Sequence, residues 1–255
     1  MERRERENQS RSIDDSDEVM TGFRSIDDDE VMTSHSNQFE AISSFPDQSE
    51  LDRFAAVANK AADAAGEAIR KYFRKPFDII DKEDSRKPLF GTLIALLHKG
   101  KPVLGIIDQP ILRERWIGIS GRRTVMNGQE VSTRSCAKLS QAYLYTTSPH
   151  HFSEDGEVAF ARVGFKVKAQ LYGCDCYAYA LLALGCVDIV MDFGLEPFDF
   201  LALIPVVEGA GGVTTDWKGH QLQWDPTSHS SEGFTVLAAG DKELHQQAVD
   251  SLQWT

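Results

Sequence analysis

The residues best suited to chemistry lie between Asp192 and Gly212. Pro197 precedes a helix-like run, at a position where its missing N–H costs nothing, and Asp199 falls in the first turn of that helix. A carboxylate at this position is favoured by the helix dipole and offers the oxygen ligands that Mg²⁺ prefers. Taken alone, Asp199 is better interpreted as a helix-capping residue, so its neighbours in the sequence have to decide its role.

The pattern around Asp199 resembles the C-terminal motif of the inositol monophosphatase superfamily. In that motif an aromatic–Asp pair opens a helix that ends in Ala-Gly-Gly, and here Phe198-Asp199 and Ala210-Gly211-Gly212 stand at the same spacing. The resemblance implies that Asp199 is a Mg²⁺ ligand. It also implies substrate contacts by Asp192, where the inositol phosphatases carry a Glu one methylene longer, and by the turn Gly173-Cys174-Asp175.

Other segments are similar to one branch of this superfamily, the plant histidinol-phosphate phosphatases, which are plastid enzymes of histidine synthesis. The resemblance covers about residues 50–254 and implies hydrolysis of L-histidinol phosphate to L-histidinol and phosphate, with inositol monophosphate as the alternative substrate. It also implies a homodimer and a location in the chloroplast stroma. The segments that carry it are Gly91–Leu97, Gly105–Pro110, Arg115–Gly118 and Leu171–Tyr179.

Two motifs of this superfamily are missing from the chain. Intact members carry Gly-Glu-Glu and Asp-Pro-Ile-Asp-Gly-Thr, which supply most of the metal-binding carboxylates. Both belong between Asp84 and Lys87, where only Ser85-Arg86 stands. We therefore expect an internal loss of several dozen residues, which would remove a helix and at least two strands and expose sheet edges. The loss predicts an impaired phosphatase, or a catalytically inactive isoform that pairs with intact subunits.

The charge of the chain is concentrated at its N-terminus. The formal net charge is -12, and residues 1–52 hold 15 acidic and 5 basic residues by count from the sequence. Residues 1–48 are predicted to be a disordered acidic tail, in which Arg11–Thr21 is nearly repeated at Arg24–Thr33. Residues 49–255 form the expected phosphatase domain. The acidic N-terminus is unlike a transit peptide and would suit a cytoplasmic protein.

Composition excludes several classes of partner. No basic patch with interleaved aromatic residues suggests nucleic-acid binding, and no apolar run is long enough to cross a bilayer. The expected partner is a small phosphorylated metabolite. The four cysteines lack zinc-site spacing and are interpreted as reduced thiols.

Hydrophobic periodicity predicts an α/β layered fold. The resemblance implies that this fold is the layered αβαβα sandwich of the superfamily, with a depleted N-terminal half. A helix is expected over 51–73, a meander of strands over 89–131, and alternating strands and helices from residue 142 onward. One continuous helix is expected over 198–209. The other expected helices cover 154–162, 176–184 and 241–252, and the other strands cover 78–81, 142–146, 166–171, 187–191, 213–215 and 235–239.

Overall fold

The computed structural model describes residues 45–75, 91–224 and 233–254, which belong to a unit that begins at Phe45. The strand expected over 78–81, the junction between Asp84 and Lys87, and residues 1–44 of the acidic tail all lie outside the described residues. Within the described part, no helix combines the length and the apolar character needed to cross a membrane.

The first element is a long helix, α1 (Gln48–Tyr72), which begins three residues before the helix expected over 51–73. The Asp47 side chain accepts a hydrogen bond from the Glu50 N–H, and the Glu50 carboxylate accepts one from the Asp47 N–H. Such a capping box satisfies two backbone donors that a helix start otherwise leaves without partners. Leu51, Ala58 and Ala62 are buried on the face that packs against a sheet.

The first sheet is an antiparallel meander in the order β1-β2-β3-β4-β5. Asn127-Gly128 joins β4 to β5, and both residues have positive φ (49° and 82°), as a two-residue hairpin turn requires. The predicted meander and its turn are therefore confirmed. Its strands are β1 (Thr92–His98), β2 (Lys101–Gln109), β3 (Glu114–Ile119), β4 (Val125–Met126) and β5 (Gln129–Glu130).

The second sheet has the order β7-β6-β8-β10-β9, with β6 parallel to both β7 and β8, and β10 antiparallel to β8 and β9. Helix α2 (Glu154–Gly164) connects β6 to β7 and packs against α6 (Lys242–Leu252). The strands are β6 (Tyr143–Thr146), β7 (Ala169–Tyr172), β8 (Ile189–Leu195), β9 (Val213–Thr215) and β10 (Phe234–Ala239).

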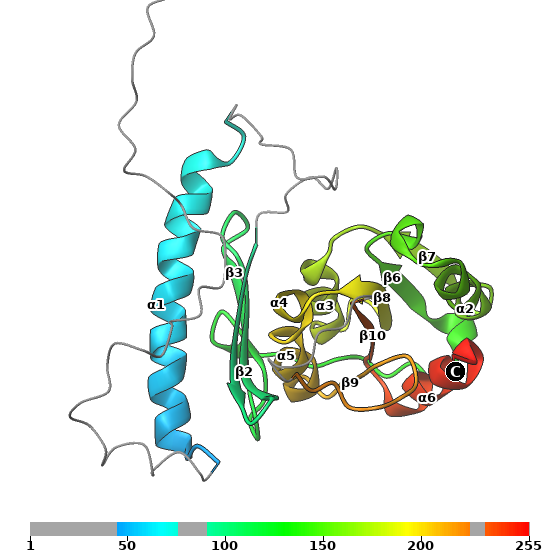
Figure 1. Ribbon diagram of the computed structural model, residues 1–255. Coiled ribbons are helices and arrows are strands. Elements are labelled where there is room, and N and C mark those ends of the chain that lie inside the picture. Colours follow the sequence, from blue (N-terminus) through cyan, green and yellow to red (C-terminus); the bar gives the residue numbers. More distant parts are fainter. Residues whose placement is uncertain (1–44, 76–90, 225–232, 255) are drawn as a thin grey trace, which may run out of the picture. The chain divides into compact units, whose positions relative to one another are not determined.

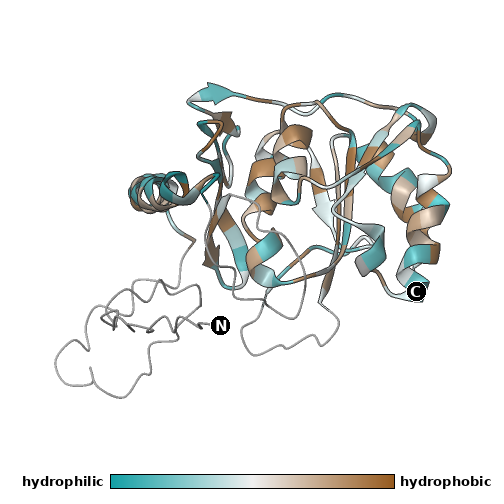
Figure 2. Ribbon diagram, turned by 90° about the horizontal axis from the view of Figure 1, so that it is seen from above, coloured by the Kyte–Doolittle hydropathy of each residue, from teal (hydrophilic) through white to brown (hydrophobic). Residues whose placement is uncertain are grey.

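Three short helices fill the space between the two sheets: α3 (Cys176–Ala183), α4 (Pro197–Phe200) and α5 (Leu203–Gly209). Helix α5 contacts β2 and β3, and α3 contacts β8, so both sheets share one apolar core. Figure 1 shows the resulting order of layers, with α1 outside the first sheet and α2 and α6 outside the second. Figure 2 shows hydrophobic residues on the helices between the sheets. The predicted αβαβα sandwich is confirmed.

The single helix expected over 198–209 was wrong, because the chain forms α4 and α5 with a break at Leu201-Ala202. Pro205 explains the break. Its ring would crowd the carbonyl of Leu201, four residues earlier, and it has no N–H to continue the helix. Restarting the helix at Leu203 puts Pro205 in a first turn, where backbone N–H groups lack intrahelical partners anyway.

The layer between the sheets sits very close to the first sheet at Gly105. A Cβ atom at this position would collide with the backbone oxygen of Ala202, at the break between α4 and α5. Only glycine allows this approach, so Gly105 sets how near β2 lies to the start of α5.

Candidate functional site

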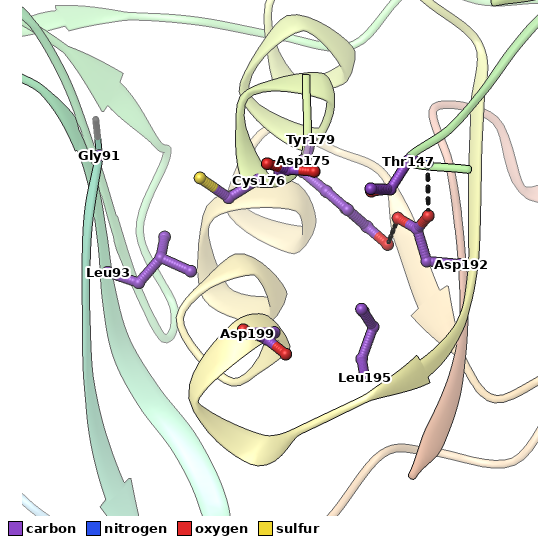
Figure 3. Close-up of a pocket in the computed structure, with 9 residues that line it drawn as sticks. All are labelled: Gly91, Leu93, Thr147, Asp175, Cys176, Tyr179, Asp192, Leu195 and Asp199. Carbon is purple, nitrogen blue, oxygen red and sulfur yellow. Dashed lines mark hydrogen bonds between the residues drawn. The ribbon is translucent and has the colours of Figure 1, made fainter. Parts of the chain in front are cut away.

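A cavity of about 250 Å³ lies where the parallel strands of the second sheet end. In such sheets the carboxyl ends of parallel strands are the usual place for ligands, because the chain turns away from the sheet there. The wall contains three carboxylates, Asp175, Asp192 and Asp199, which come from three different elements (Figure 3). The remaining lining residues are Gly91, Leu93, Thr147, Cys176, Tyr179 and Leu195.

Asp192 lies within β8 and is 2% exposed. Its Oδ1 accepts hydrogen bonds from the Thr147 N–H (2.7 Å) and the Thr146 hydroxyl (3.1 Å), and its Oδ2 accepts one from the Tyr179 hydroxyl (2.9 Å). Burial raises the pKa of Asp192, and these hydrogen bonds oppose the rise because they favour the carboxylate. The pKa of Tyr179 is raised well above its ordinary value, chiefly by complete burial and then by the neighbouring Asp192 charge, so Tyr179 stays a donor.

The predicted substrate turn, Gly173-Cys174-Asp175, connects β7 to α3. All three residues have positive φ, at 89°, 72° and 42°. Glycine adopts such angles freely, whereas Cys174 and Asp175 hold them at a cost of the order of 1–3 kcal/mol each. Backbone strain of this kind clusters at ligand sites. Asp175 lines the cavity, while Gly173 and Cys174 precede it in the turn and are not part of the cavity wall.

Asp199 stands in the first turn of α4, as the sequence predicted, and lines the cavity. Its Oδ2 accepts a hydrogen bond from the Glu196 N–H at 2.9 Å, as half of a second capping box. The interpretation of Asp199 as a helix-capping residue is thus confirmed. Because the capped carboxylate also lies in the cavity wall, this interpretation is compatible with the expected role of Asp199 as a Mg²⁺ ligand.

The described residues do not supply the donor set of a site for several Mg²⁺ ions. Among them, no three or more His, Cys, Asp or Glu side chains come together in a group that could hold a metal ion. Asp192 directs both oxygens into hydrogen bonds within the protein. Burial, together with the Asp175 charge, raises the pKa of Cys176 to about 12, so its thiol is protonated at neutral pH and offers no thiolate ligand.

Sequence reasoning missed the residues that hold Asp192 in place. Thr147 directly follows a predicted strand, so its place at a strand end was readable from the sequence. Tyr179 lies one helical turn after Asp175 on α3, and that spacing puts both on one side of the helix. The partnership of Tyr179 with Asp192 depends on the packing of α3 against β8, which no local pattern reveals.

Comparison with known proteins agrees with the fold. The model of the inositol monophosphatase family matches residues 85–253. The bifunctional phosphatase IMPL2, chloroplastic, of Arabidopsis thaliana is 53% identical over 264 residues, covering 80% of this chain and 76% of that protein. A histidinol-phosphatase of Chlorobaculum parvum is 31% identical, and the match spans 60% of this chain and 61% of that protein.

A solved structure is similar to this chain in its three-dimensional fold. An inositol monophosphatase from Zymomonas mobilis superposes with a TM-score of 0.71 at 35% identity, covering 80% of this chain and 98% of that one. The architecture and the relatives are those of phosphatases that hydrolyse phosphoric monoesters. The chain belongs to the inositol monophosphatase family, whose members are generally Mg²⁺-dependent.

Proposed function

We propose that the cavity is the substrate half of a phosphomonoester-hydrolysing site and that its substrate is L-histidinol phosphate. The observation that carries the proposal is the convergence of Asp199, Asp192 and the strained turn before α3 on one cavity. The choice of substrate is supported by the names of the relatives, which include histidinol-phosphatases of Chlorobaculum parvum and Mycobacterium tuberculosis.

Each cavity group has a role in this proposal. Asp199 contributes one carboxylate to Mg²⁺ binding, because a hard cation prefers oxygen ligands. Asp192, held by three donors, accepts a hydrogen bond from the amine of the substrate and so fixes its position. The turn Gly173-Cys174-Asp175 meets the substrate through its backbone at the start of α3, where N–H groups lack acceptors within the helix.

We further propose that this chain has little or no phosphatase activity. Hydrolysis in this family needs clustered carboxylates, and the described residues contain no such cluster. Two findings support a loss near residue 85: the family match begins there, and the alignment with the plant relative is longer than the chain. It spans 264 positions and 80% of 255 residues, about 204, so roughly 60 positions face a gap in this chain.

The test compares three proteins: the chain itself, the chain with the plant relative's missing segment inserted between Asp84 and Lys87, and that restored protein with Asp199→Asn. Phosphate release from histidinol phosphate and from inositol 1-phosphate is measured with and without Mg²⁺. We expect background rates from the chain, Mg²⁺-dependent hydrolysis of histidinol phosphate by the restored protein, and loss of that activity with Asp199→Asn.

Two results would change the proposal. A rate from the unaltered chain near that of the intact relative would refute the reasoning from missing ligands. A restored protein that prefers inositol 1-phosphate would replace the proposed substrate with the alternative.

A second candidate function is an inactive isoform that pairs with intact subunits. The observation that favours it is that both sheets and their shared core are present despite the missing motifs. Co-purification of the chain with a tagged full-length relative would support it, and failure to associate would remove it.

The chloroplast is the proposed compartment, from the name of the plant relative, and imaging of a fluorescent fusion tests it.

A further inference from the structure

A second hollow lies on the outer side of the second sheet, between α2 and the residues that follow α6. It is an open groove of about 610 Å³, on the side where Figure 1 shows α2 and α6. We call it the aromatic groove, because Phe193 and Trp254 form part of its wall, together with residues of α2. Small-molecule sites usually occupy about 300–1,000 Å³, so the groove has room for a small ligand.

Trp254 is held at the groove by the way α6 ends. Gln253 takes a left-handed conformation with φ of 48°, which turns the chain back after the helix. Arg162 of α2 donates a hydrogen bond from Nη1 to the Leu252 carbonyl at 2.8 Å, which ties the end of α6 to α2. The Trp254 ring then packs edge-on against Phe193, with ring centroids 6.0 Å apart. This wall exists before any ligand arrives, so binding does not have to order it.

Phe193 is held against the first turn of α2. A Cβ atom at Gly156 would lie only 3.1 Å from the Phe193 ring, so glycine at this position lets the ring come close to the helix. Successive residues of a strand point to opposite faces of the sheet. Phe193 therefore lies on the face of β8 opposite to Asp192, and the sheet separates the groove from the candidate phosphatase cavity.

Two opposite charges line the groove along one side of α2. Asp155 and Arg162 are seven residues apart, which places them on the same face of the helix, about two turns or roughly 10 Å apart. Side chains on a helix lean toward its N-terminus, so the long Arg162 side chain narrows the gap to Asp155. Nη1 carries only two of the five guanidinium N–H donors, so a ligand carboxylate can pair with the others.

We propose that the aromatic groove binds a free aromatic α-amino acid. The ring packs against Phe193 and Trp254, the ammonium group pairs with Asp155, and the carboxylate pairs with Arg162. An α-amino acid carries both charges on one carbon and its ring on the next, so all three groups reach the groove together. The proposal concerns binding alone and does not rest on phosphatase activity.

Other small ligands match the groove less well. An amine without a carboxylate would gain Asp155 but meet the positive charge of Arg162, and a carboxylate without an amine would meet the opposite conflict. An aliphatic amino acid would satisfy both charges but would lack the offset or edge-to-face ring contacts that aromatic walls favour. Only the combination of a ring with both charges uses all the groups of the groove.

The indole N–H of Trp254 reports on the groove directly. The chain has four tryptophans, so NMR of the ¹⁵N-labelled full chain gives a small set of indole signals, and Trp254→Phe identifies the one from Trp254. The chain is titrated with L-phenylalanine and with three compounds that each lack one feature. Phenylethylamine lacks the carboxylate, phenylpropanoate lacks the ammonium group, and L-alanine lacks the ring.

We expect L-phenylalanine to shift the Trp254 signal with a dissociation constant of about 1 mM or below, as suits a ligand of this size. Phenylethylamine and phenylpropanoate should bind about fivefold more weakly, because each loses one exposed ion pair. L-Alanine should leave the signal where it is.

Asp155→Asn and Glu154→Gln form a matched pair of variants. Each removes one negative charge from the first turn of α2, but only Asp155 lines the groove. We expect Asp155→Asn to weaken L-phenylalanine binding about fivefold without weakening the binding of phenylpropanoate, which has no ammonium group. Glu154→Gln should leave both affinities unchanged. Dispersed indole signals verify that each variant is folded.

Three outcomes would overturn the proposal. The first is a Trp254 signal that does not move up to about 10 mM L-phenylalanine, well above the expected dissociation constant. The second is a shift produced equally by L-alanine or by the singly charged compounds, which would show that the ring or the two charges are not recognised. The third is equal weakening by the two charge variants, which would reflect the general charge of α2 in place of a contact with Asp155.

Discussion

The hydrogen bond from the Tyr179 hydroxyl to Asp192 joins two residues of the cavity wall, and its contribution to stability can be measured. Tyr179 is 1% exposed, and its hydroxyl lies 2.9 Å from Asp192 Oδ2. Tyr179→Phe removes this donor while leaving the ring in the core. A hydrogen bond to a charged group contributes about 1.5–3 kcal/mol, so we expect the free energy of unfolding at pH 7 to fall by about 2 kcal/mol.

Asp192→Asn provides the matched background for this change. The amide keeps the shape of the side chain, and its NH₂ can donate to the Tyr179 oxygen, so the bond becomes one between neutral groups. Neutral bonds contribute about 0.5–1.5 kcal/mol. Tyr179→Phe should therefore cost about 1 kcal/mol less in the Asp192→Asn background, measured by urea unfolding of all four proteins. Equal costs in the two backgrounds would refute a charged acceptor at Asp192.

The pH dependence of the same proteins follows from the pKa of Asp192. Burial raises this pKa in the native state above the value of 3.8 expected in the unfolded chain. Between the two values the native state binds more protons, so stability contributed by Asp192 is gained as the pH falls and lost as it rises through the native pKa. The unaltered chain should therefore gain stability relative to Asp192→Asn as the pH is lowered from 7. A relative loss would contradict the assigned direction of the shift.

Three further predictions concern residues away from Asp192. Arg134→Ala should destabilise the fold by about 3 kcal/mol. Arg134 donates two hydrogen bonds (2.7 and 2.6 Å) to the fully buried Asp188, and its removal leaves the Asp188 charge without its ion-pair partner. An unchanged free energy of unfolding in urea would contradict this prediction. Gly105→Ala should cost about 1–3 kcal/mol through overpacking against the backbone of the layer between the sheets, and an unchanged melting temperature would show that this layer can move away. In thiol titration at pH 8, the exposed Cys186 should react first, while Cys176, with its pKa raised to about 12, should react only on unfolding. Cys186→Ser should remove the fast phase of the reaction. A fast phase that persists in this variant would contradict its assignment to Cys186.

Local features of the chain were predictable because neighbours in sequence determine them. Asp47 and Glu50 cap α1 through groups only three residues apart. Asn127-Gly128 adopts the positive φ angles that define its turn, whatever the rest of the fold does. Pro205 was also visible in the sequence, and attention to its missing N–H would have predicted the break between α4 and α5.

The candidate site also has some features that the sequence determined and others that depend on the tertiary structure. The sequence by itself determined that Asp199 stands in the first turn of a helix, and the spacing of its motif indicated the family. Only the tertiary structure decided that Asp192 is buried against Tyr179 and Thr147, since those contacts join a strand, a helix and a strand end that are distant in the chain. The long-range packing that brings three separate elements to one cavity is set by the core between the sheets, and no short-range pattern encodes it.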